Sequence, residues 1–199
     1  MDVVILLGSP RRGGNTHLMA EAFAEGARAE GAAVEMIFLD DLHIRPIGPV
    51  GDVFEQREDI RADDDARAVL EKMAAADIVV FASPVYWQGV SAQMKCLIDR
   101  QSAYYMAPWL RGGMEGSGFF VITAWGAPDE DQSHWVIDPV KRWAHGFKAR
   151  YLGEVGAAVA ELPDAKSPLD EASENLAARW LHIHHFHLNF VSDDAGAFD

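Results

Sequence analysis

The sequence predicts an α/β fold in which a five-stranded parallel sheet lies between helices on both faces, a three-layer sandwich. Three observations predict this fold. Wholly apolar runs such as residues 3–7 recur along the chain, which is typical of strands buried on both faces of a parallel sheet. Segments with helical periodicity, such as 16–30, separate these runs. The strict alternation of the two favours parallel strands joined by right-handed crossovers.

The individual elements follow from periodicity. The strands are expected at residues 3–7, 34–39, 77–82, 118–123 and 153–160. The helices are expected at residues 16–30, 63–76, 91–103, 133–150 and from 168 or 170 to 187. Each strand is a short apolar run, whereas each helix carries apolar side chains three and four positions apart, as Val69, Leu70 and Met73 do. Gly31 is expected to end the first helix.

The remaining segments are expected to be loops within one domain. Residues 42–62 have two prolines and no clear period, and a loop of this length usually has a function. Residues 108–116 are also expected to form a loop. The length of 199 residues corresponds to a single domain, expected over residues 1–191. The small, acidic tail at 192–199 is expected to fray.

The composition excludes several classes of function. The chain has 17 Lys and Arg against 31 Asp and Glu, a formal net charge of −14. Such an acidic surface repels phosphate backbones and anionic membranes, so we expect no nucleic acid and no membrane as partner. Cys96 is the single cysteine, which excludes an internal disulfide and a cysteine-ligated metal cluster. Without a membrane-length apolar stretch or a signal-like N-terminus, the protein is expected to be cytoplasmic.

The fold also predicts where a ligand would bind. In open parallel sheets, ligands lie beyond the carboxyl ends of the strands, where the strand order reverses. The loops at 8–16, 83–90 and 124–129 follow the first, third and fourth strands. All three have unusual compositions for an acidic protein, so the candidate site is expected among them.

The first of these loops has the composition of an anion site. Glycines, hydroxyl side chains and two arginines, Arg11 and Arg12, lie directly before a helix whose N-terminus favours negative charge. Its glycines match neither a nucleotide-binding P-loop nor a dinucleotide fingerprint, which favours a single phosphate. The alternative is a plain glycine turn with Asn15 or Thr16 as the helix cap.

The second and third loops have the composition of a site for a flat ligand. Tyr86 and Trp87 lie at the end of the third strand, and Trp125 lies among small residues after the fourth. Exposed backbone beside aromatic rings suits an apolar ring with polar edges. The alternative is that Tyr86 and Trp87 merely pack on neighbouring helices.

These loops resemble those of a known family. The segments Gly8-Ser9-Pro10-Arg11-Arg12-Gly13-Gly14-Asn15-Thr16, Ser83-Pro84-Val85-Tyr86-Trp87 and Ser91-Ala92-Gln93-Met94-Lys95 through Asp99-Arg100 are similar to those of the NADPH-dependent FMN reductases. The resemblance covers about residues 1–160 and implies a flavodoxin-like fold, bound FMN and reduction by NAD(P)H. It implies a small-molecule substrate and a homodimer or homotetramer whose interface borders the flavin.

The resemblance also implies the cofactor-binding residues. The FMN phosphate would be held by Ser9, Arg11, Gly14, Asn15 and Thr16. The isoalloxazine ring would be bordered by Pro84, Val85, Tyr86, Trp87, Gln88, Ala124, Trp125 and Gly126. No metal is expected, and no catalytic acid or base is assigned, because the redox chemistry would belong to the flavin.

One departure from the nearest branch of that family affects the expected function. The iron–sulfur flavoproteins carry a cysteine cluster after the second strand, whereas residues 43–51 contain no cysteine. A cluster is therefore excluded, and hydride would pass through the flavin alone to a small acceptor such as a quinone or free flavin. The alternatives are an electron carrier or regulatory module without its own substrate turnover, and a degenerate fold without flavin.

Two further features have simpler explanations. His182, His184, His185 and His187 could pair on helix faces, but no carboxylate or cysteine completes a metal site, and a helix end or subunit contact is expected. Cys96 is expected to be a packing residue rather than a redox thiol.

Overall fold

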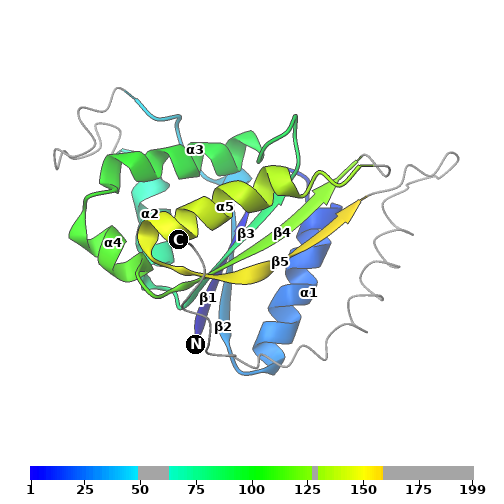
Figure 1. Cartoon of the computed structure of the whole chain (residues 1–199), viewed down its shortest axis with the longest axis horizontal. Coiled ribbons are helices and arrows are strands. Elements are labelled where there is room, and N and C mark those ends of the chain that lie inside the picture. The colour runs from blue at the N-terminus through cyan, green and yellow to red at the C-terminus, as the bar shows by residue number, and fades with distance from the viewer. Residues whose placement is uncertain (49–62, 127–129, 159–199) are drawn as a thin grey trace, which may run out of the picture.

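The fold is a parallel sheet of five strands (Figure 1). The computed structural model describes residues 1–48, 63–126 and 130–158. The strands are β1 (Asp2–Leu7), β2 (Ala33–Phe38), β3 (Ile78–Pro84), β4 (Gly118–Trp125) and β5 (Arg150–Ala158). Their order across the sheet is β2-β1-β3-β4-β5, and every neighbouring pair is parallel. The order reverses between β1 and β3, which is the switch point of a flavodoxin-like sheet.

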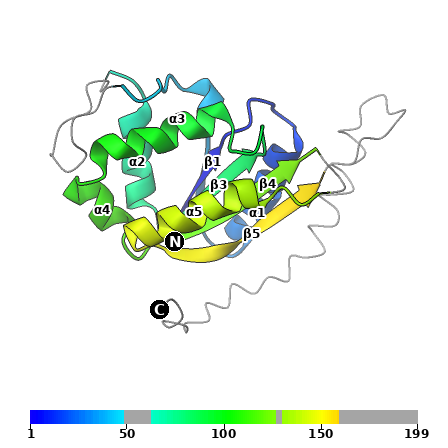
Figure 2. The same ribbon diagram turned by 45° about the horizontal axis from the view of Figure 1, so that its top comes forward.

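Helices cover both faces of the sheet (Figure 2). In the described residues the helices are α1 (Asn15–Ala29), α2 (Ala66–Ala75), α3 (Ala92–Arg100), α4 (Pro108–Met114) and α5 (His134–Phe147), with short 3₁₀ helices η1 (Leu39–Asp41) and η2 (Gln101–Tyr104). One core cluster joins α2, α3, α4 and α5 to the sheet, and the other joins α1 to the opposite face. The predicted three-layer α/β sandwich is confirmed.

The alternation of side chains along the central strands creates these two cores. Leu6 and Phe81 face the four-helix side, whereas Ile5 and Val80 face α1. All four are buried, which explains why the strands are apolar at every position. Gly8 ends β1 in a position where an added Cβ would lie 2.6 Å from the Ser91 hydroxyl oxygen. The first loop therefore starts tight against the beginning of α3.

The carboxyl edge of the sheet is stepped. β1 pairs with β3 only as far as Leu7, opposite Ala82. β3 continues for two more residues and pairs with β4 as far as Pro84, opposite Ala124. At about 3.3 Å per residue, β3 therefore ends roughly 7 Å beyond β1. We call this difference the step. Along the strand direction, the loop after β1 therefore begins before the loops after β3 and β4.

One element was predicted wrongly. Residues 108–116 were expected to be a loop, but α4 occupies most of them. Pro108 stands in the first helical turn, where its missing N–H costs nothing, and Gly113 allows α4 to approach the backbone of Ala74 in α2. The other expected elements occur in the described residues with shifted ends. The helix expected up to residue 187, the tail at 192–199 and residues 49–62 lie outside those residues.

No helix within the described ranges is long and apolar enough to cross a membrane.

Candidate functional site

The N-terminus of α1 presents backbone donors that nothing in the chain caps. Gly14 is the N-cap residue, no side chain caps the helix, and its first turn contains no acidic residue. The alternative of an Asn15 or Thr16 cap is therefore wrong. The first-turn N–H groups of a helix have no intrahelical acceptor, so those of Asn15, Thr16 and His17 remain available to an anion.

The loop before α1 is held in shape by its own hydrogen bonds. The backbone N–H of Arg11 donates to the hydroxyl of Ser9 at 3.2 Å, and Ser9 is buried. The N–H of Gly13 donates to Nδ1 of His17 at 2.8 Å. Gly13 has a φ of 70°, a left-handed conformation that glycine adopts without a steric penalty. These hydrogen bonds thus hold the loop around the helix N-terminus.

The two arginines of this loop have different surroundings. Arg12 forms an ion pair with Asp41, and its guanidinium lies 4.0 Å from the ring centre of Phe38. The Arg11 side chain is exposed and has no ion pair or hydrogen bond with the described residues. Arg11 is therefore the cation available to a ligand at the α1 N-terminus, whereas Arg12 joins the loop to the end of β2.

The loop after β3 is built on buried serines. The hydroxyl of Ser83 accepts a hydrogen bond from the N–H of Ser91 at 3.0 Å. The hydroxyl of Ser91 in turn accepts one from the N–H of Met94 and so caps α3. Both serines are fully buried. These bonds fix the two ends of the loop, and the N–H of Tyr86 closes its tip on the carbonyl of Gly89 at 2.9 Å.

The tip of this loop holds its aromatic side chains in solvent. Trp87 is completely exposed, with a relative accessibility of 101%, and Tyr86 is 45% exposed. The alternative that both merely pack on helices is wrong for Trp87. Trp87 and Gln88 have φ values of 46° and 61°, left-handed conformations that cost a side-chain-bearing residue about 1–3 kcal/mol and that cluster at functional sites.

The third loop begins with two buried polar atoms that lack a partner. The hydroxyl of Thr123 and the indole nitrogen Nε1 of Trp125 have no hydrogen bond within the described residues. Trp125 lies over Gly156 of β5, where an added Cβ would come within 2.8 Å of the indole ring. A buried donor without an acceptor is costly, so both atoms could bond a ligand at this edge of the sheet.

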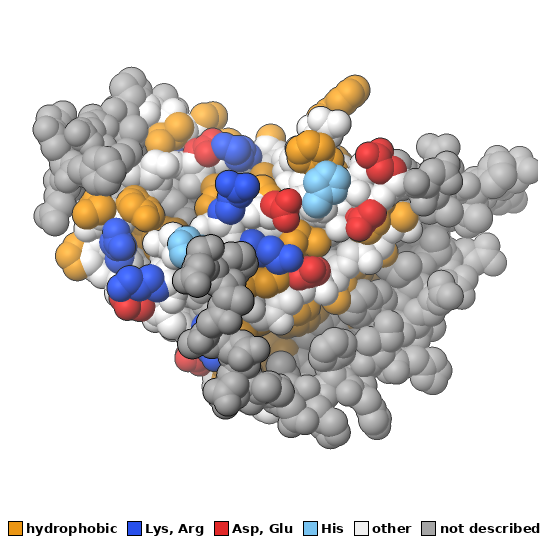
Figure 3. Space-filling view, in the orientation of Figure 1, with side chains coloured by type: hydrophobic (Ala, Val, Ile, Leu, Met, Phe, Trp, Pro, Cys, Tyr) orange, Lys and Arg blue, Asp and Glu red, His pale blue; other side chains and the backbone are white. Residues whose placement is uncertain are grey.

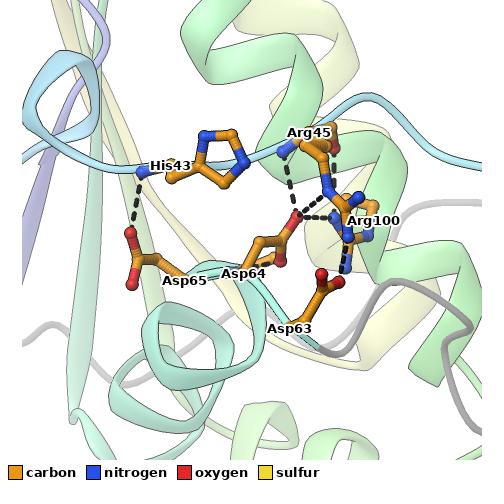
Figure 4. Close-up of polar contacts among 7 residues, drawn as sticks. His43, Arg45, Asp63, Asp64, Asp65 and Arg100 are labelled. Carbon is orange, nitrogen blue, oxygen red and sulfur yellow. Dashed lines mark hydrogen bonds and ion pairs between the residues drawn. The ribbon is translucent and has the colours of Figure 1, made fainter.

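A buried ion pair anchors the chain on either side of residues 49–62 (Figure 4). Arg100 of α3 is wholly buried and pairs with Asp64, whose side chain is also inaccessible. Asp64 accepts a further hydrogen bond from the N–H of Arg45 at 3.0 Å. Burial raises the pKa of Asp64, but the hydrogen bonds from Arg100 and the backbone outweigh burial and lower it below its ordinary value. The aspartates at 63–65 thus precede α2 and bond Arg45, Arg100 and the backbone of His43.

Cys96 lies on α3, half-buried. Burial and the nearby Asp99 carboxylate raise the pKa of its thiol, so the neutral form dominates at pH 7. The packing role of Cys96 stays a prediction. The histidines at 182–187 lie outside the described residues.

The model of the NADPH-dependent FMN reductase family matches residues 1–126. The chain belongs to this family. The flavodoxin-like fold is confirmed, and membership supports FMN as the cofactor and NAD(P)H as the electron donor. No cysteine lies at residues 43–51, so the departure from the iron–sulfur branch stands.

Three known proteins illustrate what the chain is similar to. An iron–sulfur flavoprotein of Archaeoglobus fulgidus is 30% identical over 195 residues, which cover 88% of this chain and 86% of that protein. An NAD(P)H dehydrogenase (quinone) of Cupriavidus metallidurans is 30% identical over 114 residues, 56% of this chain and 52% of that protein. The solved structure of an NAD(P)H:quinone oxidoreductase from Methanothermobacter marburgensis has a TM-score of 0.61 and 19% identity, and the match covers 94% of this chain and 98% of that one.

The chain's own residues fit FMN. The uncapped N–H groups of α1 and the Arg11 guanidinium suit a phosphate, and the aromatic loop one step higher suits a ring. Sequence reasoning placed the three loops correctly at one edge of the sheet. It missed Thr123, whose orphaned hydroxyl on an apolar strand has no signal in the sequence, and the Arg100–Asp64 pair, whose partners lie 36 positions apart.

Proposed function

We propose that this protein is an FMN-dependent oxidoreductase that takes hydride from NAD(P)H and delivers two electrons to a small acceptor such as a quinone or free flavin. The observation that carries the proposal is the anion site at the start of α1. It has uncapped N–H groups, an unpaired Arg11 within the described residues, and the aromatic loop of β3 beside it. In an acidic protein, such a site favours one phosphate bound next to an apolar ring.

Five residues would hold the phosphate. They are Ser9, Arg11, Gly14, Asn15 and Thr16. The backbone of Asn15 and Thr16 would donate hydrogen bonds, and the α1 dipole would favour the dianion. Arg11 would add a charge-assisted bond, and Gly14 leaves room for the Arg11 side chain, which would lie 3.2 Å from an added Cβ. Ser9 acts mainly by shaping the loop, because its hydroxyl already bonds the Arg11 N–H.

The second and third loops would border the ring. The residues proposed to line it are Pro84, Val85, Tyr86, Trp87, Gln88, Ala124, Trp125 and Gly126. The Val85 N–H is already used by the carbonyl of Ala124 at 2.9 Å, which joins the two loops into one wall. Trp87, held outward by its backbone, would stand beside the open face of the ring and offer a flat acceptor an aromatic surface.

FMN, when bound, supplies the chemistry of accepting and donating hydride. The protein's part is to orient the ring, to exclude water from one face and to leave the other accessible to NAD(P)H and then to the acceptor. No side chain at the loops is proposed as a proton donor or acceptor.

An electron-carrier function is the second candidate. It is favoured by the similarity to an iron–sulfur flavoprotein over most of the chain. The absence of cysteines other than Cys96 argues against it, because a cluster has no thiolate ligands in this chain. A homodimer or homotetramer remains a prediction.

The visible spectrum of the purified protein, followed by anaerobic titration with NADH and NADPH, tests both candidates. Flavin bands that bleach on addition of a pyridine nucleotide, with turnover when a quinone is added, support the oxidoreductase. Flavin that stays oxidised supports the carrier. A colourless protein that takes up no added FMN overturns the proposal.

A further inference from the structure

A groove lies between α3 and α5, on the outer surface of the four-helix side of the sheet. Its volume is about 430 Å³, within the range of small-molecule pockets. The lining includes Ile98, Gln101, Tyr105, Arg142, Trp143 and Phe147. Gly146 also lines it, and the absence of a side chain there keeps the groove open. The proposed function uses none of these residues.

The groove is separate from the candidate flavin site. The flavin loops meet the first residue of α3, Ala92, whereas Gln101 follows its last residue. Nine helical residues at 1.5 Å each separate the two places by about 14 Å along the helix. A ligand in the groove would therefore not touch the flavin loops.

The polar groups of the groove include donors in need of an acceptor. Gln101 is 6% exposed, and its amide nitrogen Nε2 is buried without a hydrogen-bond partner in the described part of the chain. The Arg142 side chain has no ion pair or hydrogen bond with the described residues. The indole N–H of Trp143 has no hydrogen-bond partner among them either. A buried amide donor without an acceptor is unfavourable, and a ligand acceptor would give it a partner.

The charges of the groove favour an anion. Figure 3 shows Lys and Arg side chains over α3 and α5, with Asp and Glu side chains among them, in a protein of net charge −14. Asp99 is the acidic residue in the lining, and it forms an ion pair with Lys95 one turn earlier on α3. The positive charge of Arg142 is thus available to a ligand.

The apolar groups favour a flat ring. Trp143, Tyr105 and Phe147 line the groove, and the side chains of Tyr105 and Phe147 pack edge to face with ring centres 5.5 Å apart. None of them belongs to the exposed large hydrophobic residues of the described surface, which are Met1, Tyr86 and Trp87. A recessed aromatic lining of this kind suits an inserted small molecule better than a flat protein interface.

We propose that the α3–α5 groove is a second ligand site and binds a small planar aromatic carboxylate. The ring would lie against Trp143 and Tyr105, and the carboxylate would accept hydrogen bonds from Arg142 and the Gln101 amide. Rotation of that amide would turn Nε2 from the interior to the ligand. This proposal stands independently of the proposed function.

Calorimetric titration of the full chain with 2-naphthoate tests the site, with FMN added so that the flavin site is filled. We expect one naphthoate per chain, and about tenfold weaker binding of the neutral 2-naphthamide. Arg142→Gln and Gln101→Leu should each weaken naphthoate binding about tenfold or more. Lys141→Gln is the matched control, because it removes a charge next to Arg142 but outside the lining, and it should change the affinity less than threefold.

Three outcomes would overturn the proposal. One is no naphthoate binding at millimolar concentration. Another is binding that Arg142→Gln and Gln101→Leu leave unchanged, which would place the probe elsewhere. The third is an oligomer, seen by sedimentation velocity, that Arg142→Glu dissociates, which would show that a second copy covers the groove. Gln101→Leu should keep or raise the unfolding temperature, which separates lost binding from lost folding.

Discussion

Arg11 and Arg12 are neighbours in the sequence, but the fold gives them different roles. Arg12 bonds Asp41 and stacks on Phe38, so it holds the first loop against the end of β2. Arg11 has no such partner among the described residues. Sequence reasoning chose Arg11 through the family resemblance. Composition alone could not choose, because the partner of Arg12 comes from a segment 29 positions away.

Arg11→Ala should therefore weaken FMN binding far more than Arg12→Ala. Loss of a hydrogen bond to a charged group costs about 1.5–3 kcal/mol, roughly 10- to 150-fold in affinity. Arg12→Ala removes an exposed ion pair worth about 0–1 kcal/mol and should change affinity by less than about fivefold. Quenching of FMN fluorescence on titration with each variant measures both constants. Equal losses in the two variants would contradict the assignment.

Trp87→Gly should leave the free energy of unfolding almost unchanged, within about 1 kcal/mol. The side chain is wholly exposed, and glycine adopts the left-handed φ of 46° without strain. The same variant should lower kcat/KM for aromatic acceptors. Urea unfolding and steady-state kinetics give the two values. A loss of several kcal/mol would mean that a second subunit buries Trp87 in the assembled protein.

At the scale of elements, the buried Arg100–Asp64 pair joins α3, α2 and the chain after η1. Neither side chain of the pair is exposed to solvent. Asp64 also accepts a hydrogen bond from the backbone N–H of Arg45. Removing one partner of a buried pair leaves an uncompensated buried charge. The loss of stability is then larger than the net stability that the intact pair contributed. These elements therefore depend on Asp64 for their mutual position.

Asp64→Asn should lower the free energy of unfolding by about 3–5 kcal/mol at pH 7. Asp63→Asn, a control at a largely exposed carboxylate, should cost less than about 1 kcal/mol. The folded-state pKa of Asp64 is depressed, so its contribution is complete above the ordinary value of 3.8 and disappears as the pH falls through the folded value. Urea unfolding of the parent and both variants between pH 7 and 3 measures this. A difference between parent and Asp64→Asn that does not shrink below about pH 4 would contradict the argument.

Most elements could be predicted from the sequence because their patterns are local. The run at Val79, Val80 and Phe81 is apolar on both faces, and only a strand between two helical layers buries it that way. The helix α4 could not, because Gly112 and Gly113 are poor helix formers. Its existence depends on the close approach of Gly113 to α2, a tertiary contact that no local pattern shows.

At the scale of the whole molecule, the net charge of −14 opposes the binding of the anions that the site is built for. A pyridine nucleotide is itself an anion, so it meets long-range repulsion as it approaches the protein. Salt screens the long-range part first, since the Debye length falls from about 30 Å at 0.01 M to about 8 Å at 0.15 M.

The KM for NADPH should therefore fall several-fold as NaCl is raised from 0.01 to 0.15 M. Most enzymes with basic nucleotide sites on neutral surfaces would show the opposite trend. Steady-state rates of NADPH oxidation at fixed pH and varied salt check the sign. A KM that rises over this range would mean that local positive charges outweigh the charge of the whole molecule.

Because of the step at the carboxyl edge, the lengths of β1 and β3 set the distance between the loops that follow them. The height difference between the loop after β1 and the loop after β3 depends on where these strands stop pairing. One residue inserted into β1 before Gly8 would raise the first loop by about 3.3 Å and turn Ser9 toward the opposite face of the sheet. Every loop residue would still be present, yet the distance between the two loops would be too short for FMN. The spacing between the proposed phosphate and ring sites thus depends on the number of residues in the buried strands, and not on the loops that would touch the ligand.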